Sequence, residues 1–150
     1  MAIVSCLVDT NILLRLTRRS DPQHAIVDAA PARLASQGTV LHYTHQNIAE
    51  LWNVLTRPVV RNGFGLTTAD AEREVRAIEA GMSFLPDSDP VYREWRGIVV
   101  RCDVSGVQVH DARLVASMYV HHVYHILTLN VFDFSRFSGI SALHPNVARG

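Results

Sequence analysis

Four acidic residues stand close to the ends of predicted strands or the starts of predicted helices. They are Asp9, Glu50, Asp111 and Asp133. Like charges brought together destabilise a fold unless something neutralises them, and a hard divalent cation does so. Mg²⁺ takes oxygen ligands, keeps several waters, and needs only a few carboxylates beside substrate phosphates. These residue types therefore fit a Mg²⁺ or Mn²⁺ site, provided that the fold gathers them.

Each of the four positions also has a purely structural explanation. Asp9 could cap a helix, and Glu50 could be a solvated charge on a helix face. Asp111 could complement the dipole of its helix, and Asp133 could be a turn residue. Any one of them alone is more often structural than catalytic. Spacing by itself leaves the two explanations about even, and the joint placement favours function.

An alternation of strands and helices must position these acids. Residues 2–8 are mostly apolar and predict a buried strand that stops at Asp9. Further strands are predicted over 39–42, 82–85, 125–129 and 140–143. Helices are predicted from residue 12, over 21–37, 45–56, 68–80 and 87–102, and from residue 110. This alternation favours a parallel sheet with helices on both faces, where ligands bind at the carboxyl ends of the strands.

Prolines and capping residues set several boundaries. Pro31 interrupts the second predicted helix, so we expect a kink or a break near Ala30. Thr44 and Thr68 are expected to cap the helices that follow them. The residues from Pro145 onwards are expected to form a loose tail.

Length and composition favour one domain over residues 1–150. Fourteen basic residues balance fourteen acidic ones, so net charge does not indicate a strongly basic nucleic-acid binder. No apolar run reaches the roughly 20 residues of a membrane span, and no secretory signal is recognisable. Cys6 and Cys102 are the only cysteines, which is typical of reduced thiols and a cytoplasmic location.

Four segments resemble, in order, the sequence motifs of PIN-domain proteins. They are Leu7–Leu13, Gln46–Pro58, His110–Ala116 and Thr128–Phe134. The resemblance covers nearly the whole chain. It implies an α/β fold with a PIN-like parallel β-sheet flanked by α-helices on both faces, a metal-dependent nuclease site, and RNA as the usual substrate. The small single-domain form looks most like VapC-type toxins, which are ribonucleases held inactive by an antitoxin and commonly homodimeric.

The same resemblance suggests roles for individual residues. Asp9, Glu50 and Asp111 match the acidic core of the family. The fourth position lies between Asn130, where many relatives carry an acid, and Asp133, which we prefer. Groups that would orient the acids or the substrate are Thr10, Asn11, Thr128 and Asn130. Arginines near the motifs could contact RNA phosphates, although a surface ion pair is the commoner role of any single one. They are Arg15, Arg57, Arg113 and Arg136.

Several other functions are compatible with parts of the pattern. The chain could be a catalytically silent PIN-like RNA-binding or assembly module, or a housekeeping PIN nuclease without an antitoxin. A haloacid-dehalogenase-type phosphatase does not fit, because Asn11 stands where it needs a second aspartate and the chain has no lysine. His121 and His125 are one helical turn apart, but no cysteine or glutamate nearby completes a zinc site. Trp52 and Trp95 are expected in the core or an interface rather than under RNA bases.

Overall fold

Five parallel strands form one sheet in the computed structural model, which describes residues 2–17 and 24–148. The strands are β1 (Ser5–Val8), β2 (Val40–Thr44), β3 (Ser83–Leu85), β4 (His125–Leu127) and β5 (Ser141–Leu143). Their order across the sheet is β3-β2-β1-β4-β5. The strand β1 is central, with Leu7 opposite His42 of β2 and Ile126 of β4. The predicted α/β class and parallel sheet are confirmed.

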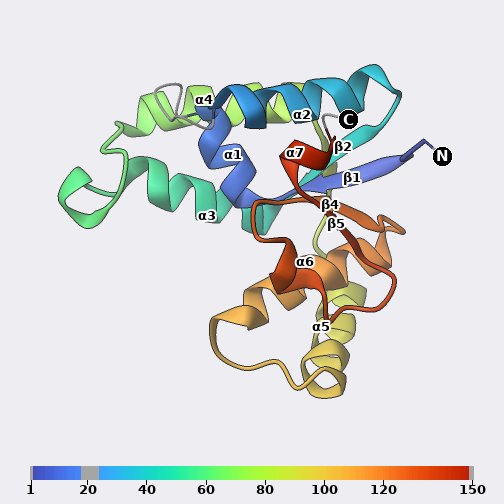
Figure 1. Ribbon diagram of the computed structural model, residues 1–150. Coiled ribbons are helices and arrows are strands. Elements are labelled where there is room, and N and C mark those ends of the chain that lie inside the picture. The colour runs from blue at the N-terminus through green and yellow to red at the C-terminus, as the bar shows by residue number, and fades with distance from the viewer. Residues whose placement is uncertain (1, 18–23, 149–150) are drawn as a thin grey trace.

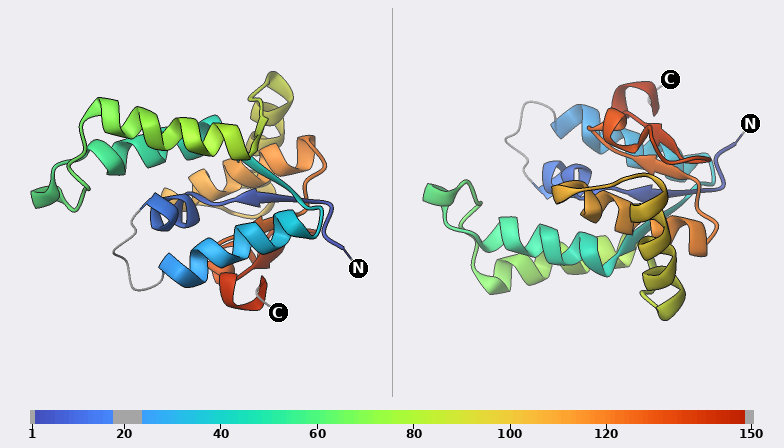
Figure 2. Two further views of the ribbon diagram at one scale, coloured as in Figure 1. Left: turned by 90° about the horizontal axis from the view of Figure 1, so that it is seen from above. Right: turned by 90° about the horizontal axis from the view of Figure 1, so that it is seen from below.

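Helices cover both faces of this sheet (Figure 1). The α-helices are α1 (Thr10–Thr17), α2 (His24–Ser36), α3 (His45–Thr56), α4 (Thr68–Gly81), α5 (Asp89–Arg101), α6 (Val109–Val120) and α7 (Pro145–Ala148). Single 3₁₀ turns are η1 (Val59–Arg61), η2 (Gly106–Gln108) and η3 (Val131–Phe134). The pair α3 and α4 extends away from the sheet and carries η1 at its far end (Figure 2). None of the helices in the described ranges is both long and apolar enough to cross a bilayer.

The central strand explains why the first apolar run is nearly continuous. Cys6 and Val8 belong to the core under α1 to α4, whereas Leu7 belongs to the core under α5 and α6. Alternate side chains of a strand point to opposite faces, and both faces are covered here. All three side chains are completely buried. Asp9, directly after them, is therefore held at a rigid strand end.

The helix α3 begins as its sequence predicts. The Thr44 side chain accepts the N–H of Asn47, and the Asn47 side chain accepts the N–H of Thr44, which makes a reciprocal cap. For α4 the prediction was one residue late. Thr67, not Thr68, is the capping residue, because its hydroxyl accepts the N–H of Asp70 at 3.1 Å.

Two expectations need correction. Of the kink or break expected near Ala30, the break does not occur, because α2 continues through Pro31. Val27, Ala30 and Leu34 are buried in one core along the helix, and this packing holds both halves in place at the cost of one hydrogen bond. The predicted start of this helix at residues 21 and 22 lies outside the described ranges. The expected loose tail is instead α7, which packs against α2 through residue 148.

Candidate active site

Asp9 and Thr128 meet because their strands are neighbours. The Asp9 N–H donates to the Leu127 carbonyl at 3.0 Å, which continues the β1–β4 pairing by one residue. The Thr128 hydroxyl donates to Asp9 Oδ2 at 2.7 Å. The Thr10 N–H donates to Asp9 Oδ1 at 2.8 Å. Both carboxylate oxygens of Asp9 are therefore bonded by groups at the carboxyl ends of β1 and β4.

Asn11 completes this network from the first turn of α1. Its Nδ2 donates to Asp9 Oδ2 at 3.4 Å and to Thr128 Oγ1 at 3.3 Å. Its Oδ1 accepts the N–H of Leu129 at 3.2 Å. The Asn130 N–H donates to Thr128 Oγ1 at 3.0 Å. Segments separated by more than one hundred residues are thus joined around a single carboxylate.

Burial raises the pKa of Asp9 above its ordinary value. The hydrogen bonds from Thr128 and from the Thr10 N–H oppose this rise, since they stabilise the charged form. The negative charges of Glu50 and Asp133 raise the pKa further. Only 7% of Asp9 is exposed, so these charges act on it through protein more than through water.

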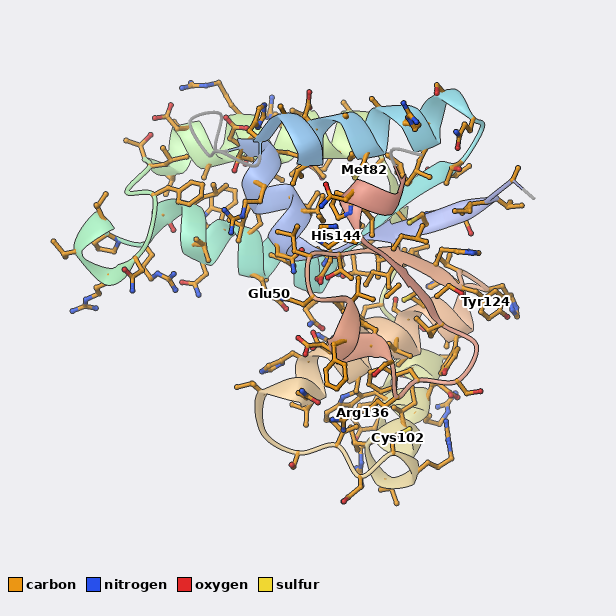
Figure 3. The ribbon with its side chains drawn as sticks, viewed as in Figure 1. Glu50, Met82, Cys102, Tyr124, Arg136 and His144 are labelled. Atoms are coloured by element: carbon orange, nitrogen blue, oxygen red, sulfur yellow. The ribbon has the colours of Figure 1, made fainter. Side chains whose placement is uncertain are left out.

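Glu50 is tied to the start of α6 through Gln46. The Gln46 amide Nε2 donates to Glu50 Oε1 at 2.7 Å and to the His110 carbonyl at 2.8 Å. Glu50 lies on the side of α3 that faces α6 and η3 (Figure 3). One turn of α3 therefore fixes the position of Glu50 relative to Asp111, the residue after His110.

A second tie joins α3 to α1. The Asn47 Nδ2 donates to the Thr10 hydroxyl at 3.0 Å, and Asn47 is completely buried. Sequence reasoning included Gln46 and Asn47 in one of the four motif segments but assigned neither of them to the site. The spacing of Thr44 and Asn47 was the available signal, because a polar residue three positions after a capping threonine can return the capping bond.

Asp111 lies in the first turn of α6 and is only partly buried. Burial is the largest cause that raises its pKa from 3.8 to about 7. The charges of Asp9, Asp133 and Glu50 also raise it, in that order. The four acidic residues singled out from the sequence therefore lie close enough to influence one another electrostatically.

A hollow of about 380 Å³ lies in front of these groups. Its walls include Asp9, Glu50 and Asp111 together with Thr10, Asn11 and Asn130. Asp133 is not part of the wall, although its charge reaches both Asp9 and Asp111. Asn53, one turn after Glu50 on α3, does line the hollow and was not predicted as a site residue. We name this feature the acidic hollow.

The donor atoms of the acidic hollow are carboxylate, amide and hydroxyl oxygens, which suit a hard cation. Within residues 2–17 and 24–148, however, no three His, Cys, Asp or Glu side chains form a group that could hold a metal ion by themselves. The chemistry therefore fits a cation that keeps several waters, as Mg²⁺ does. The same finding leaves the histidines near the end of α6 without a zinc site among the described residues. His121 Nε2 is bonded to the Pro86 carbonyl and His122 Nδ1 to the Tyr124 hydroxyl.

The four arginines proposed for phosphate contacts lie outside the walls of the acidic hollow. Arg113 forms an ion pair with Asp87. Arg57 donates from Nη2 to the Asn62 carbonyl at 3.0 Å, inside the loop that follows α3. Arg136 is exposed after η3, and Arg15 lies in the last turn of α1. Contact with phosphate would require RNA to extend beyond the hollow.

The PIN domain family matches residues 6–138, and the chain belongs to this family. No curated protein sequence matches it significantly. The fold is similar to that of VapBC2 from Rickettsia felis bound to a promoter DNA fragment. The two chains are 10% identical with a TM-score of 0.71, over 94% of this chain and 98% of the other.

Two further solved structures are similar. FitAcB from Neisseria gonorrhoeae is 20% identical with a TM-score of 0.69, over 93% of this chain and 97% of the other. VapC20 from Mycobacterium tuberculosis, described as a sarcin-ricin loop cleaving toxin, is 17% identical with a TM-score of 0.61. That match covers 81% of this chain and 86% of VapC20. At these identities the likeness establishes a shared fold.

Proposed function

We propose that this chain is a Mg²⁺- or Mn²⁺-dependent endoribonuclease that hydrolyses phosphodiester bonds in cytoplasmic RNA, with residues 1–150 acting as one PIN-like domain. One observation carries the proposal. Asp9, Glu50 and Asp111 come from three separate parts of the chain and line one hollow. The charge of Glu50 raises the pKa of Asp9, and the charges of Asp9 and Glu50 raise the pKa of Asp111. A gathering of like charges that the fold does not neutralise is what a cation-dependent site requires.

The contacts of each acidic residue indicate its role in cation binding. Asp9 would be the central ligand, because it is buried and its orientation is held by Thr128 and Asn11. Glu50 and Asp111 would approach the ion from α3 and α6. We assign the fourth acidic role to Asp133, on the strength of its charge effects on Asp9 and Asp111. Asn130, which lines the hollow, would contact either the acids or the substrate.

When bound, Mg²⁺ would lower the pKa of a coordinated water and stabilise charge on the phosphoryl oxygens. The protein supplies the placement. Asp9 stays fixed because both of its oxygens accept hydrogen bonds, whereas Gln46 sets the distance between α3 and α6. Asp111 has to release its proton to act as a ligand, since its pKa is raised to about 7 in the protein without a cation.

We further propose that the chain is the toxin of a type II toxin–antitoxin pair and forms a homodimer. Support comes from its likeness to structures described as VapBC and toxin–antitoxin complexes. A groove of about 400 Å³ between α3, α4 and β3 offers apolar surface for a protein partner, with Tyr43, Ile48, Trp52 and Phe84 in its walls. A monomeric mass for the purified chain, together with the lack of a small upstream reading frame, would contradict this part.

Incubation of the purified protein with a mixed RNA substrate and Mn²⁺ tests the activity. We expect cleavage that stops when the cation is chelated and is lost in Asp9→Asn. Equal cleavage by Asp9→Asn and wild type would show that the acidic hollow is not the site of cleavage. No cleavage with either cation would favour a silent RNA-binding module instead. Cleavage without any antitoxin gene beside the coding sequence would favour a housekeeping nuclease.

A further inference from the structure

A second hollow, of about 730 Å³, opens between the N-terminal turns of α5 and α6. Its size is within the roughly 300–1,000 Å³ of typical small-molecule sites. Tyr92 and Trp95 contribute to its wall from α5, and His110 and Arg113 from α6. We name this feature the aromatic hollow. No role has been assigned to it so far.

The first turn of α6 borders both the aromatic hollow and the acidic hollow. His110 lines the former, and its neighbour Asp111 lines the latter. The Gln46 amide donates to Glu50 and to the His110 carbonyl, which ties this turn to α3. An RNA chain with its phosphate at the acidic hollow can therefore reach the aromatic hollow along the same turn.

The aromatic side chains offer surfaces on which a flat ring can stack. Tyr92 is 55% exposed. Its ring centroid lies 6.2 Å from that of Trp95, with the two planes tilted by 42°. The Trp95 indole is fixed because its Nε1–H donates to the Val109 carbonyl at 2.8 Å. Unpaired RNA bases are bound in this way, by stacking on aromatic side chains.

The aromatic hollow presents an unpaired carboxylate to a ligand. Asp87 and Asp89 both line it, and Arg113 is paired with Asp87. The Arg96 guanidinium lies over the Tyr92 ring, 6.0 Å from its centroid. In the part of the chain that the structure describes, the Asp89 carboxylate has no hydrogen-bond or ion-pair partner and is exposed. An unpaired carboxylate repels a phosphate but accepts hydrogen bonds from an exocyclic amino group, as Asp does from cytosine N4. The complementary ligand is a neutral base that carries such a group.

We infer that the aromatic hollow binds an unpaired nucleobase with an exocyclic amino group, next to the scissile phosphate of the RNA substrate. This inference rests on the proposed ribonuclease function and adds base recognition to it. Tyr92 supplies the stacking surface and Asp89 the acceptor. Base contacts carry sequence information, whereas phosphate contacts do not, so this hollow would bias which sites are cleaved.

Trp95 fluorescence measures binding directly. In a Trp52→Phe variant, Trp95 is the only tryptophan. We expect saturable quenching by adenosine, cytidine and guanosine in EDTA, and binding of uridine at least about fivefold weaker. In the same background, Tyr92→Ala should weaken the binding of all four nucleosides by about fivefold or more. Asp89→Ala, which removes the acceptor, should abolish the difference between uridine and the others.

Tyr124→Ala is the matched control. Tyr124 is 43% exposed and precedes β4, at the opposite end of the strands from Glu50 (Figure 3). Its loss should leave nucleoside binding unchanged. The lack of saturable quenching by any nucleoside, or equal binding by Tyr92→Ala and Tyr124→Ala, would overturn the inference. Thermal melting of each variant checks that the exposed substitutions leave the fold intact.

RNA cleavage separates this inference from the proposed function. If wild type cleaves and Asp9→Asn does not, the nuclease proposal holds. In that case we expect Tyr92→Ala to raise KM at least about fivefold and to change the distribution of cleavage sites. An unchanged KM and product pattern would overturn base recognition alone. Saturable nucleoside binding by a protein that never cleaves RNA would overturn the nuclease proposal and leave the base site standing.

Discussion

The two sides of the acidic hollow differ in how firmly they hold their carboxylates. On the side of β1 and β4, Asp9 is buried and accepts hydrogen bonds from Thr10, Asn11 and Thr128. On the side of α6, Asp111 is partly exposed, and no hydrogen bond to its carboxylate is found among the described residues. Its pKa is raised to about 7, mainly by burial. The Asp9 side is therefore held in place without a cation, whereas the Asp111 side depends on a cation to neutralise its charge.

The two sides of the acidic hollow therefore differ in rigidity: the end of β1 is rigid, and the first turn of α6 is more adaptable. The end of the central strand cannot move without disturbing both cores, because Leu7 and Val8 pack on opposite faces. The first turn of α6 contributes Asp111 to the acidic hollow and is tied to α3 by the hydrogen bond from Gln46 to the His110 carbonyl. We expect substitutions on the Asp9 side to disturb the positions of the cation ligands. We expect substitutions on the Asp111 side to change the charge of the site.

The largest effect should come from Asp9→Asn. Loss of residues that merely support a metal ligand costs about 10- to 100-fold, so loss of the central ligand should reduce RNA cleavage by more than about 100-fold. The melting temperature should change little, because removal of a buried charge offsets the loss of one accepted hydrogen bond at the new NH2 group. Cleavage rates and thermal melting in parallel check both statements. A large fall in melting temperature would show that Asp9 is structural.

Thr128→Val should cost both cation affinity and stability. It removes the 2.7 Å bond to Asp9 and leaves that carboxylate less satisfied in a buried place. We expect Mn²⁺ affinity to fall by about 10- to 100-fold. The free energy of unfolding should fall by about 1–3 kcal/mol. Calorimetric titration with Mn²⁺ and urea unfolding measure the two effects.

Thr68→Val is the matched control for that substitution, since Thr68 is exposed in the first turn of α4. It should leave Mn²⁺ affinity unchanged. If the two valine substitutions had equal effects on Mn²⁺ binding, the Thr128 bond would not make the Asp9 side of the acidic hollow firmer than the Asp111 side.

Gln46→Leu should have a smaller effect, on the adaptable side. It removes the bonds to Glu50 and to the His110 carbonyl. We expect about tenfold weaker cation binding, at the lower end of the effect of a supporting residue. Gln37→Leu, in the exposed turn after α2, is the control. If Gln46→Leu binds Mn²⁺ like wild type, the tie between α3 and α6 does not position Glu50.

The smallest effect should be a pH dependence of stability in the protein without divalent cations. The pKa of Asp111 is raised from 3.8 to about 7, so the folded protein holds a proton that the unfolded chain releases. The stabilisation is complete below the unfolded pKa and is lost as pH rises through about 7. Melting temperatures in EDTA should therefore fall over this range. Asp111→Asn should flatten that fall, and Mg²⁺ should oppose it in wild type only.

Much of the fold could be predicted from local patterns. The apolar run before Asp9 predicted a strand buried on both faces, and Thr44 predicted the start of α3. Pro31 was misread because tertiary packing of α2 outweighs the local cost of a proline, which no local pattern reveals. The segment after Pro145 looked like a tail for the same reason, since its helix is held by contact with α2.

The sequence by itself determined the α/β class, the parallel sheet and the positions of the acidic residues along the chain. These follow from hydrophobic periodicity and capping, which act over a few residues. Only the tertiary structure decided which groups hold those acids. The contact of Gln46 with His110 spans 64 residues, that of Asn47 with Thr10 spans 37, and that of Thr128 with Asp9 spans 119. Such bonds depend on how the strands and helices pack together, and short-range sequence patterns do not record that packing.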